Sequence, residues 1–422
     1  GAPSLELRSD RLDRVVSMVT KYKSEIISAL QDDFGNRDPV MSAATEVDSV
    51  IGPMMHAKKN LKKWMKTEKR KAAIAPLGSA LSLLGAKAEI RYQPKGVVGA
   101  ISPWNFPLNL ALAPLAGILS AGNRVMLKPS ELTPASSDLT KLMIEEFFDD
   151  SEIAVFIGDP EVGAAFSGLA FDHLIFTGGT AIAKHVMKAA SENLVPLTLE
   201  LGGKSAAIVY DDADIDNLID SIRWGIFYNA GQVCSAMSRV IVPQNLHGEI
   251  SERAGELAKS LSVGPGSERT EFGFNMGSMI SELQRDRALA LCQKAQIEGA
   301  TTVTGGHKLN RPGWFLERTV FNNVKPDMEK YASGYANYAN LMLKEIVPYY
   351  EVAIVGKDAH TKAMELNKKY VPNKLLLGSL ESSKMKLLQE KYVQGRTMIY
   401  VCENKACQLP TTNIMQAQKL MK

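Results

Sequence analysis

Cysteine is scarce in this sequence. Four cysteines among 422 residues are too few for a disulfide scaffold, which concentrates its cysteines in a short chain. Four residues separate Cys402 from Cys407, and no second cysteine pair or histidine pair completes a zinc site. We therefore expect reduced thiols, no structural metal, and a buried Cys292 within an amphipathic helix.

Long apolar runs and a strong charge of either sign are missing too. No uncharged stretch approaches the ~20 apolar residues that a membrane-spanning helix needs, and the N-terminus lacks the basic-then-apolar order of a signal peptide. The net charge of +3 gives no reason to expect nucleic acid or a membrane surface as a partner. We expect a cytoplasmic protein of two or three domains whose partner is a small molecule.

Strands and helices are predicted to alternate over the middle of the chain. Two amphipathic helices, at residues 11–34 and 38–65, come first, and a strand at 88–92 follows them. The β-α-β repetition indicates an α/β fold with a doubly wound parallel sheet, in which ligands bind beyond the carboxyl ends of the strands. The predicted strands are 97–101, 124–128, 154–157, 173–176 and 206–210, with helices at 108–121, 135–148 and 163–169 and another that begins at 213–214.

The loop after the first of these strands is stiff and polar. It reads Ser102-Pro103-Trp104-Asn105, followed by a phenylalanine and a second proline. An asparagine between aromatic residues offers two N–H donors in a setting poor in water, as an oxyanion hole requires. The alternative is that Asn105 only holds a turn.

The loop after the second strand carries a cation and a carboxylate. Lys128 could meet ribose hydroxyls or a phosphate, and Glu131 could accept both hydroxyls of an adenosine ribose. A carboxylate there would favour NAD over NADP, because it repels a 2′-phosphate. The alternative is a surface ion pair between the two side chains.

The fourth strand runs into Phe176-Thr177-Gly178-Gly179 at the start of a helix. Paired glycines let the backbone approach a pyrophosphate, and a helix N-terminus supplies free N–H groups and a partial positive charge. Two glycines before a helix are common, however, and the spacing is not Gly-x-Gly-x-x-Gly. The local signal for a nucleotide is therefore weak when taken alone.

Two further residues are candidates for catalysis. Glu200 is a single carboxylate in an apolar run, which suits a general base, although it could equally cap a loop or pair with Lys204. Cys234 is flanked by small residues that a substrate can approach closely, so it is a candidate nucleophile. Its alternative is an inert core cysteine.

In combination these motifs resemble the aldehyde dehydrogenase superfamily, and over residues 4–327 the coniferyl aldehyde dehydrogenases. Pro-Trp-Asn-Phe-Pro, Lys-Pro-Ser-Glu, Phe-Thr-Gly-Gly-Thr, Leu-Glu-Leu-Gly-Gly-Lys and Gly-Gln-Val-Cys stand in the order and approximate spacing of that family. The resemblance implies Cys234 as nucleophile and Glu200 as general base. It also implies that Asn105 and the backbone N–H of Cys234 are the oxyanion donors.

The same resemblance implies a site for NAD, with NADP as the alternative cofactor. Lys128 and Glu131 would meet the adenosine ribose, and the helix that begins after Gly179 would meet the pyrophosphate and adenine. Ala183 departs from the family, in which many members have glycine there. The implied cofactor residues are Ser102, Pro103, Trp104, Lys128, Glu131, Gly163, Phe176, Thr177, Gly178, Gly179 and Ile182.

The resemblance also divides the chain. Residues 1–224 would form the N-terminal helices and the dinucleotide-binding domain, 225–330 a truncated catalytic domain, and 331–422 an atypical tail. Beyond Asp327 the family's Glu-x-Phe-Gly-Pro segment and oligomerising strand do not appear. The tail instead resembles the C-terminus of large thioredoxin-like proteins with an α-toroid domain.

The tail has a pattern of its own, which predicts strands at 350–355, 374–380 and 397–402 and helices at 359–369 and 383–392. One hypothesis is that residues 345–348 act as a surrogate for the missing segment, with Glu345 replacing its glutamate. The alternative is an independent appendage.

The function that the resemblance implies is oxidation of an aldehyde, with an aromatic one such as coniferyl aldehyde as the candidate, to its carboxylic acid. A cysteine thioester and hydride transfer to NAD(P) would carry the reaction. The alternative is a catalytically impaired fusion that at most binds nucleotide. Members of the family are homo-oligomers.

Overall fold

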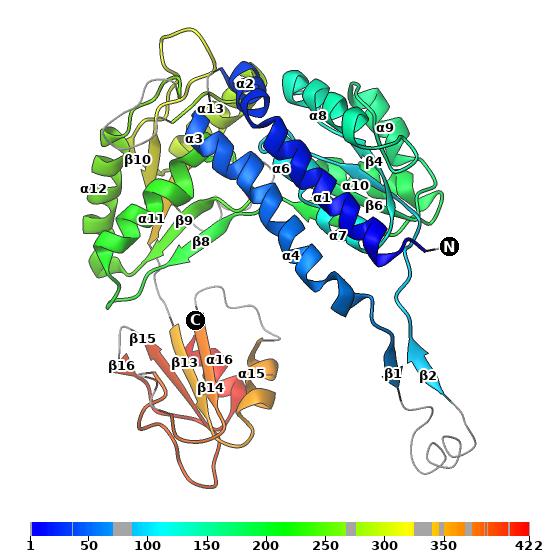
Figure 1. Cartoon of the computed structure of the whole chain (residues 1–422). Coiled ribbons are helices and arrows are strands. Elements are labelled where there is room, and N and C mark those ends of the chain that lie inside the picture. Colours follow the sequence, from blue (N-terminus) through cyan, green and yellow to red (C-terminus); the bar gives the residue numbers. More distant parts are fainter. Residues whose placement is uncertain are drawn as a thin grey trace. The chain divides into compact units, whose positions relative to one another are not determined.

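The computed structural model describes residues 2–35, 37–70, 87–266, 276–324, 340–345, 350–367, 374–383, 385, 387–403 and 406–421. The chain divides into two compact units (Figure 1). Unit 1 comprises Gly1–Ala207, Ala213–Val240 and Glu249–Leu343, and unit 2 comprises Ile208–Asp212, Ile241–Gly248 and Lys344–Lys422. Among the described residues, no helix has the length and apolar character needed to cross a membrane.

A five-stranded sheet forms the centre of the first half of unit 1. Its strands run in the order β5-β4-β3-β6-β7 and every pairing is parallel, so the predicted parallel sheet is confirmed. The winding reverses between β3 and β6, where Ile101 stands opposite both Lys128 and Phe176. Ligands bind at such a reversal. The strands are β3 (Val97–Ile101), β4 (Arg124–Lys128), β5 (Ile153–Val155), β6 (His173–Gly178) and β7 (Leu197–Leu201).

Helices cover this sheet, and one predicted helix is broken. Residues 108–121 form two helices because Pro114 lacks an N–H and clashes with the preceding turn. Figure 1 shows α8 and α9 near β4 and β6, with α1 and α4 crossing in front of α6 and α7. These helices are α6 (Pro107–Leu112), α7 (Leu115–Ser120), α8 (Pro134–Phe147), α9 (Pro160–Ser167) and α10 (Thr180–Ser191).

The N-terminal helices are interrupted as well. The first predicted helix divides at Tyr22, and the second contains a stretch of π-helix, η1 (Ala43–Asp48). A π-helix inside an α-helix often lies at a functional site. The elements are α1 (Leu5–Lys21), α2 (Lys23–Phe34), α3 (Pro39–Ser42) and α4 (Ser49–Trp64), followed by the antiparallel pair β1 (Glu68–Arg70) and β2 (Ala88–Ile90).

The last strand of the parallel sheet has two different faces. Leu197, Leu199 and Leu201 pack against a buried apolar cluster that includes Phe176. Alternation along the strand turns Thr198 and Glu200 to the opposite face. The leucine neighbours of Glu200 therefore point away from it and its side chain is exposed, so the apolar run in the sequence does not bury this carboxylate.

A second five-stranded sheet has the order β10-β11-β12-β9-β8. A short 3₁₀ turn, η2 (Tyr228–Gly231), leads from α11 toward β9, and Cys234 lies between them. The strands are β8 (Ser205–Ile208), β9 (Met237–Val242), β10 (Thr301–Thr304), β11 (Thr319–Asn322) and β12 (Asn340–Glu345), with α11 (Ile215–Phe227), α12 (Gln244–Ser260) and α13 (Glu282–Ile297). Residues 346–348 of the surrogate hypothesis lie outside the described residues.

Unit 2 contains a four-stranded sheet of order β14-β13-β15-β16 with a core of Val352, Ile354, Ile399 and Val401. The predicted strands and the first predicted helix are confirmed. The helix predicted for 383–392 is wrong: residues 387–390 form a turn, the other described residues of this range are not helical, and Glu390 adopts a left-handed φ of 58°. The elements are β13 (Tyr350–Val355), α15 (Ala359–Asn367), β14 (Lys374–Ser379), β15 (Met398–Glu403), β16 (Ala406–Cys407) and α16 (Ile414–Leu420).

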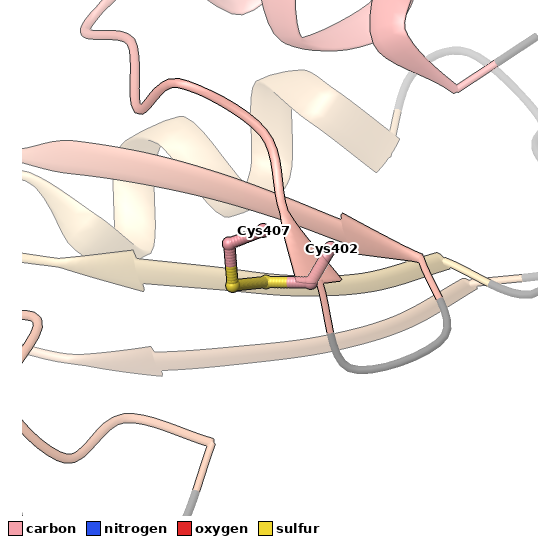
Figure 2. The surroundings of a disulfide bond; sticks show 2 residues. All are labelled: Cys402 and Cys407. Carbon is pink, nitrogen blue, oxygen red and sulfur yellow. A yellow bond between two sulfur atoms is a disulfide. The ribbon is translucent and has the colours of Figure 1, made fainter.

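The prediction of reduced thiols is wrong for one pair of cysteines. Cys402 and Cys407 form a disulfide between β15 and β16 (Figure 2). The two strands are antiparallel, and their register makes these cysteines direct partners across the ladder. The sequence separation alone did not reveal the hairpin that closes the pair. Cys292 is buried as predicted, with 2% of its surface exposed.

An ion-pair cluster ties α1 to the turn before β5. Glu152 accepts hydrogen bonds from Arg11 Nε at 2.8 Å and from Arg14 Nη1 at 2.8 Å. Arg14 also donates to the carbonyl of Phe147 and covers the Phe148 ring. Hydrogen bonds from Arg14 are the main reason why the pKa of Glu152 falls to about 2.

We expect Glu152→Gln to lower the free energy of unfolding by about 1 kcal/mol at neutral pH, because solvent screens a partly exposed cluster. A carboxylate with a lowered pKa stabilises the fold above its unfolded pKa, and the stabilisation is lost as the pH falls toward the folded value. The difference between wild type and variant in urea unfolding should therefore shrink between about pH 5 and pH 2. Glu145→Gln, which removes an exposed pair with Lys141, is the control. A difference that is independent of pH would contradict the assignment.

Candidate active site

The ends of β3, β4 and β5 are joined by hydrogen bonds through Lys128. The backbone N–H of Ser102 donates to the carbonyl of Lys128 at 3.1 Å. Lys128 Nζ donates to the carbonyl of Gly158 at 2.7 Å, to that of Pro129 at 3.0 Å, and to Glu131 Oε2 at 3.3 Å. The structure thus brings together the predicted residues Ser102, Lys128 and Glu131 of two strand ends, and joins them to Gly158 after the third, which was not predicted. Lys128 and Glu131 do form an ion pair, but Lys128 is only 3% exposed, so it is not the surface pair given as the alternative.

Ser102 and Glu131, both at this edge of the sheet, differ in exposure. The hydroxyl of Ser102 is buried without a hydrogen-bond partner among the described residues. The side chain of Glu131 is 38% exposed, so its carboxylate can accept further hydrogen bonds. Pro103 and Trp104 are half-buried beside Ser102. The edge therefore offers both a buried hydroxyl and an open carboxylate.

The start of α10 is open to a ligand. Gly179 occupies the N-cap position and has no side chain to occupy the free N–H groups there. A Cβ on Gly178 would lie 2.6 Å from the Phe176 ring, so a side chain does not fit between this turn and the strand. Thr177, at the end of β6, is half-buried. Ala183 is 2% exposed, and its methyl group packs into the core below the helix.

Apolar side chains are exposed on the two neighbouring helices α9 and α10, which contact each other. Ile182 on α10 is 57% exposed, and Val162 on α9 is 37% exposed. Gly163 follows Val162, and a Cβ there would lie 3.7 Å from Cε of Lys128. Val162 was missed by the sequence reasoning, because one valine in a short helix carries no signal until its neighbours are known.

The segment that leads to Cys234 has an unusual backbone. Asn229, Ala230 and Gly231 all have a positive φ, of 50°, 55° and 73°. The turn that they form leaves Gln232 fully buried, while the side chain of Cys234 is exposed. The core alternative for Cys234 is therefore not what the structure shows.

Gln232 fixes this segment to the rest of unit 1. Its Nε2 donates to the carbonyls of Asn229 at 3.1 Å and Ser278 at 3.2 Å, and its Oε1 accepts from the N–H of Ile280 at 3.0 Å. In the sequence, Gln232 stands out only as part of the Gly-Gln-Val-Cys motif. Its anchoring role depends on Ser278 and Ile280, which are distant in sequence.

Asn105 joins the first loop to the cysteine segment. Its Nδ2 donates to the carbonyl of Gln232 at 2.9 Å, and its own carbonyl accepts from Asn229 Nδ2 at 3.3 Å. One amide hydrogen is used in the first contact, and the second is left to donate elsewhere. Asn105 is 5% exposed. The side chain is thus held two residues before Cys234.

Cys234 and Glu200 line the same cavity, which has a volume of about 610 Å³. Leu110 and Pro114 of the α6–α7 segment form part of its apolar wall. The N–H of Gly203 donates to the carbonyl of Cys234 at 3.2 Å, which links the loop after β7 to the cysteine segment. The structure therefore brings the predicted nucleophile and the predicted base to one hollow.

Lys204 does not pair with Glu200 among the described residues. Burial, and then the neighbouring Arg239, lower the pKa of Lys204 to about 8. Its carbonyl accepts a hydrogen bond from Arg239 Nη2 at 2.6 Å. The carboxylate of Glu200 is thus not neutralised by the lysine that follows it in the sequence.

A doubly wound sheet, with an exposed cysteine and a glutamate that line one cavity, is the arrangement of an α/β enzyme with a cysteine nucleophile. The pattern of the aldehyde dehydrogenase family matches residues 2–333, and the chain belongs to that family. The chain is 54% identical over 328 residues to a probable coniferyl aldehyde dehydrogenase of Caulobacter vibrioides, covering 78% of this chain and 65% of that one. It is 47% identical over 244 residues to the coniferyl aldehyde dehydrogenase of a Pseudomonas species, covering 58% of this chain and 49% of that one.

Solved structures share the fold. Substrate-bound AldH of Staphylococcus aureus superposes with a TM-score of 0.72 at 26% identity, covering 99% of this chain and 88% of that one. Aldehyde dehydrogenase C of Pseudomonas syringae, solved with NAD⁺ and octanal, superposes with a TM-score of 0.71 at 27% identity, covering 83% of this chain and 72% of that one. The chain spans only 49% to 66% of the length of three curated relatives that it matches.

We expect Gln232→Ala to lower the free energy of unfolding by about 3 kcal/mol, because it leaves buried carbonyl and N–H groups without partners. Urea unfolding measures this loss. Gln296→Ala is the matched control, since Gln296 is exposed and makes one hydrogen bond, to Thr302. Its effect should stay within about 0.5 kcal/mol. Equal losses in the two variants would show that Gln232 is not an anchor.

Proposed function

We propose that this protein oxidises an aldehyde to its carboxylic acid with NAD(P) as the hydride acceptor. The observation that carries the proposal is the cavity that exposed Cys234 and Glu200 both line, with Asn105 hydrogen-bonded to the segment that carries Cys234. Membership of the aldehyde dehydrogenase family supports it. The activity of the whole protein is part of the proposal, because the chain spans only part of its relatives.

Cys234 is the nucleophile in this proposal. Its sulfur adds to the aldehyde carbon, and the carbonyl oxygen takes the electron pair of the broken π bond. The free amide hydrogen of Asn105 and the backbone N–H of Cys234 donate to that oxygen. Because Asn105 is fixed by Gln232, it need not reorganise when the charge develops.

Glu200 is the general base for the second half of the reaction. The thioester left on Cys234 is attacked by water, and Glu200 takes a proton from that water. The thiolate leaves, and the carboxylic acid is released. An exposed carboxylate on the cavity face of β7 has access to solvent water, which supports this role over a purely structural one.

The edge of the parallel sheet fits a dinucleotide. The free N–H groups at the start of α10 suit a pyrophosphate, and the exposed Val162 and Ile182 suit the faces of an adenine ring. The hydroxyl of Ser102 has no hydrogen-bond partner among the described residues, so its donor is unused. NAD(P), when bound, would accept the hydride that leaves the aldehyde carbon and so oxidise it to the acyl level.

Glu131 favours NAD in this proposal. Its open carboxylate would accept hydrogen bonds from the two ribose hydroxyls and repel a 2′-phosphate. Lys128 holds that carboxylate at 3.3 Å and also ties the loops after β4 and β5. Phe176, Thr177, Gly178, Gly163, Pro103 and Trp104 complete the proposed cofactor set.

The proposed substrate is an aromatic aldehyde of the coniferyl type, which the names of the Caulobacter and Pseudomonas relatives support. A cytoplasmic location and assembly into a homo-oligomer are part of the same proposal. The competing function is nucleotide binding without turnover, and the experiments below separate the two.

We expect Cys234→Ala to abolish formation of NADH from coniferyl aldehyde, because no other group supplies the acyl-carrying sulfur. Absorbance at 340 nm measures turnover, with NAD and NADP compared side by side. Cys292→Ala, at the buried reduced cysteine, should retain the wild-type rate. Turnover that survives Cys234→Ala would overturn the assignment. Binding of NAD without turnover in the wild type would favour the competing function.

We expect Glu200→Gln to slow the hydrolysis of the acyl-enzyme about 100-fold while leaving its formation unchanged. With p-nitrophenyl acetate, the variant should give a normal burst of nitrophenolate followed by a slow steady state. Glu192→Gln, at an exposed position after α10, provides the control. A normal steady state in Glu200→Gln would assign the base to another residue.

A further inference from the structure

A buried ion pair contacts the loop that carries Asn105. Arg37, between α2 and α3, and Glu46, in the π-helix η1, are 7% and 0% exposed. Arg37 Nη1 lies 3.1 Å from Glu46 Oε1. Removing two charges from water is costly, and the attraction between them compensates for this only when the remaining hydrogen bonds are well made. The other partners of the pair therefore indicate what it does.

Those partners belong to the loop that carries Asn105 and to the first turn of α6, which follows the loop. Arg37 Nη1 donates to the carbonyl of Asn105 at 3.1 Å, and Glu46 Oε2 accepts from the N–H of Asn109 at 2.8 Å. Asn109 stands in the first turn of α6, where N–H groups have no partner within the helix and a carboxylate is favourable. The ion pair thus hydrogen-bonds to the backbone at Asn105 and at Asn109, on either side of Phe106 and Pro107.

Arg37 and the π-helix η1 are also linked to Tyr228, in the segment that precedes Cys234. The guanidinium of Arg37 lies 4.8 Å from the centre of the Phe106 ring, and that ring stacks on Tyr228 at 6.1 Å. The hydroxyl of Tyr228 donates to Thr45 Oγ1 at 3.2 Å, and Thr45 is the neighbour of Glu46. The start of α6, which follows Asn105, and Tyr228, which precedes Cys234, therefore both hydrogen-bond to the π-helix η1.

Asn105 is consequently held from two directions. Its carbonyl accepts from Arg37 on one side and from Asn229 on the other, while its amide donates to Gln232. We propose that Arg37 and Glu46 are positioning residues that set the direction of the Asn105 amide toward the oxygen of the reacting carbonyl. This inference rests on the proposed function, because it assigns Asn105 the role of an oxyanion donor.

Two reactions of Cys234 separate positioning from simple support of the fold. Acylation by p-nitrophenyl acetate forms the S–C bond, expels nitrophenolate, and passes through a negatively charged oxygen that Asn105 would stabilise. Alkylation by iodoacetamide forms an S–C bond and expels iodide without creating such an oxygen. A positioning defect should therefore slow the first reaction and spare the second. Neither reaction needs the cofactor.

The variants are Arg37→Lys, which keeps the charge and loses the forked donors, and Glu46→Gln, which keeps acceptor and shape and loses the charge. We expect acylation to fall about 10- to 100-fold in each, and alkylation of Cys234 to stay within about twofold. In an Asn105→Ala background, Arg37→Lys or Glu46→Gln should cause no further loss, because the donor that they position is already absent. Mass spectrometry of the Cys234 peptide measures alkylation.

Glu152→Gln is the matched control, since it breaks another arginine–glutamate cluster of unit 1 and should leave both rates unchanged. If Arg37→Lys loses its native far-UV circular dichroism, Glu46→Gln alone carries the comparison. Equal losses in both reactions, or additive losses with Asn105→Ala, would overturn the positioning role. A wild type that is alkylated at Cys234 but never acylated would overturn the proposed function, and the inference with it.

Discussion

A buried hydrogen bond from Asn105 to the carbonyl of Gln232 joins two segments that are 127 residues apart in the chain. On one side it depends on β3, which delivers Asn105 to the carboxyl edge of the parallel sheet. On the other it depends on the left-handed turn before Gln232, which points Cys234 outward. Without this bond, the loop that carries Asn105 and the segment that carries Cys234 would lose a direct side-chain link. Cys234, two residues after Gln232, lines the cavity that Glu200 also lines.

The parallel sheet and its edge residues could be predicted from the sequence, because both depend on local patterns. Apolar runs between turn residues identify the strands, and parallel strands must present their carboxyl ends at one edge. Lys128, Gly178 and Asn105 therefore lie where the prediction placed them. The predicted boundaries of β3 and β4 agree with the structure for the same reason.

What could not be predicted depends on pairing over distance or on backbone geometry. Arg37 and Glu46 look like ordinary polar residues of amphipathic helices until the Asn105 loop packs on them. The disulfide between Cys402 and Cys407 follows from the register of a hairpin that no turn motif announces. The exposure of Glu200 follows from which face of β7 meets the core. In each case the local sequence is compatible with more than one contact or degree of exposure, and tertiary packing determines which one forms.

The turn before Cys234 has a consequence for how this protein tolerates change. Ala230 is buried and holds a φ of 55°, a conformation that costs an alanine roughly 1 kcal/mol or more relative to glycine. The fold is thus less stable than it would be with glycine at this position, yet glycine would also let the turn relax. A rigid alanine restricts the nearby Cys234 to fewer orientations. At this residue, glycine would favour stability and alanine a fixed orientation of the Cys234 sulfur. Selection for heat resistance alone would therefore replace Ala230 with glycine.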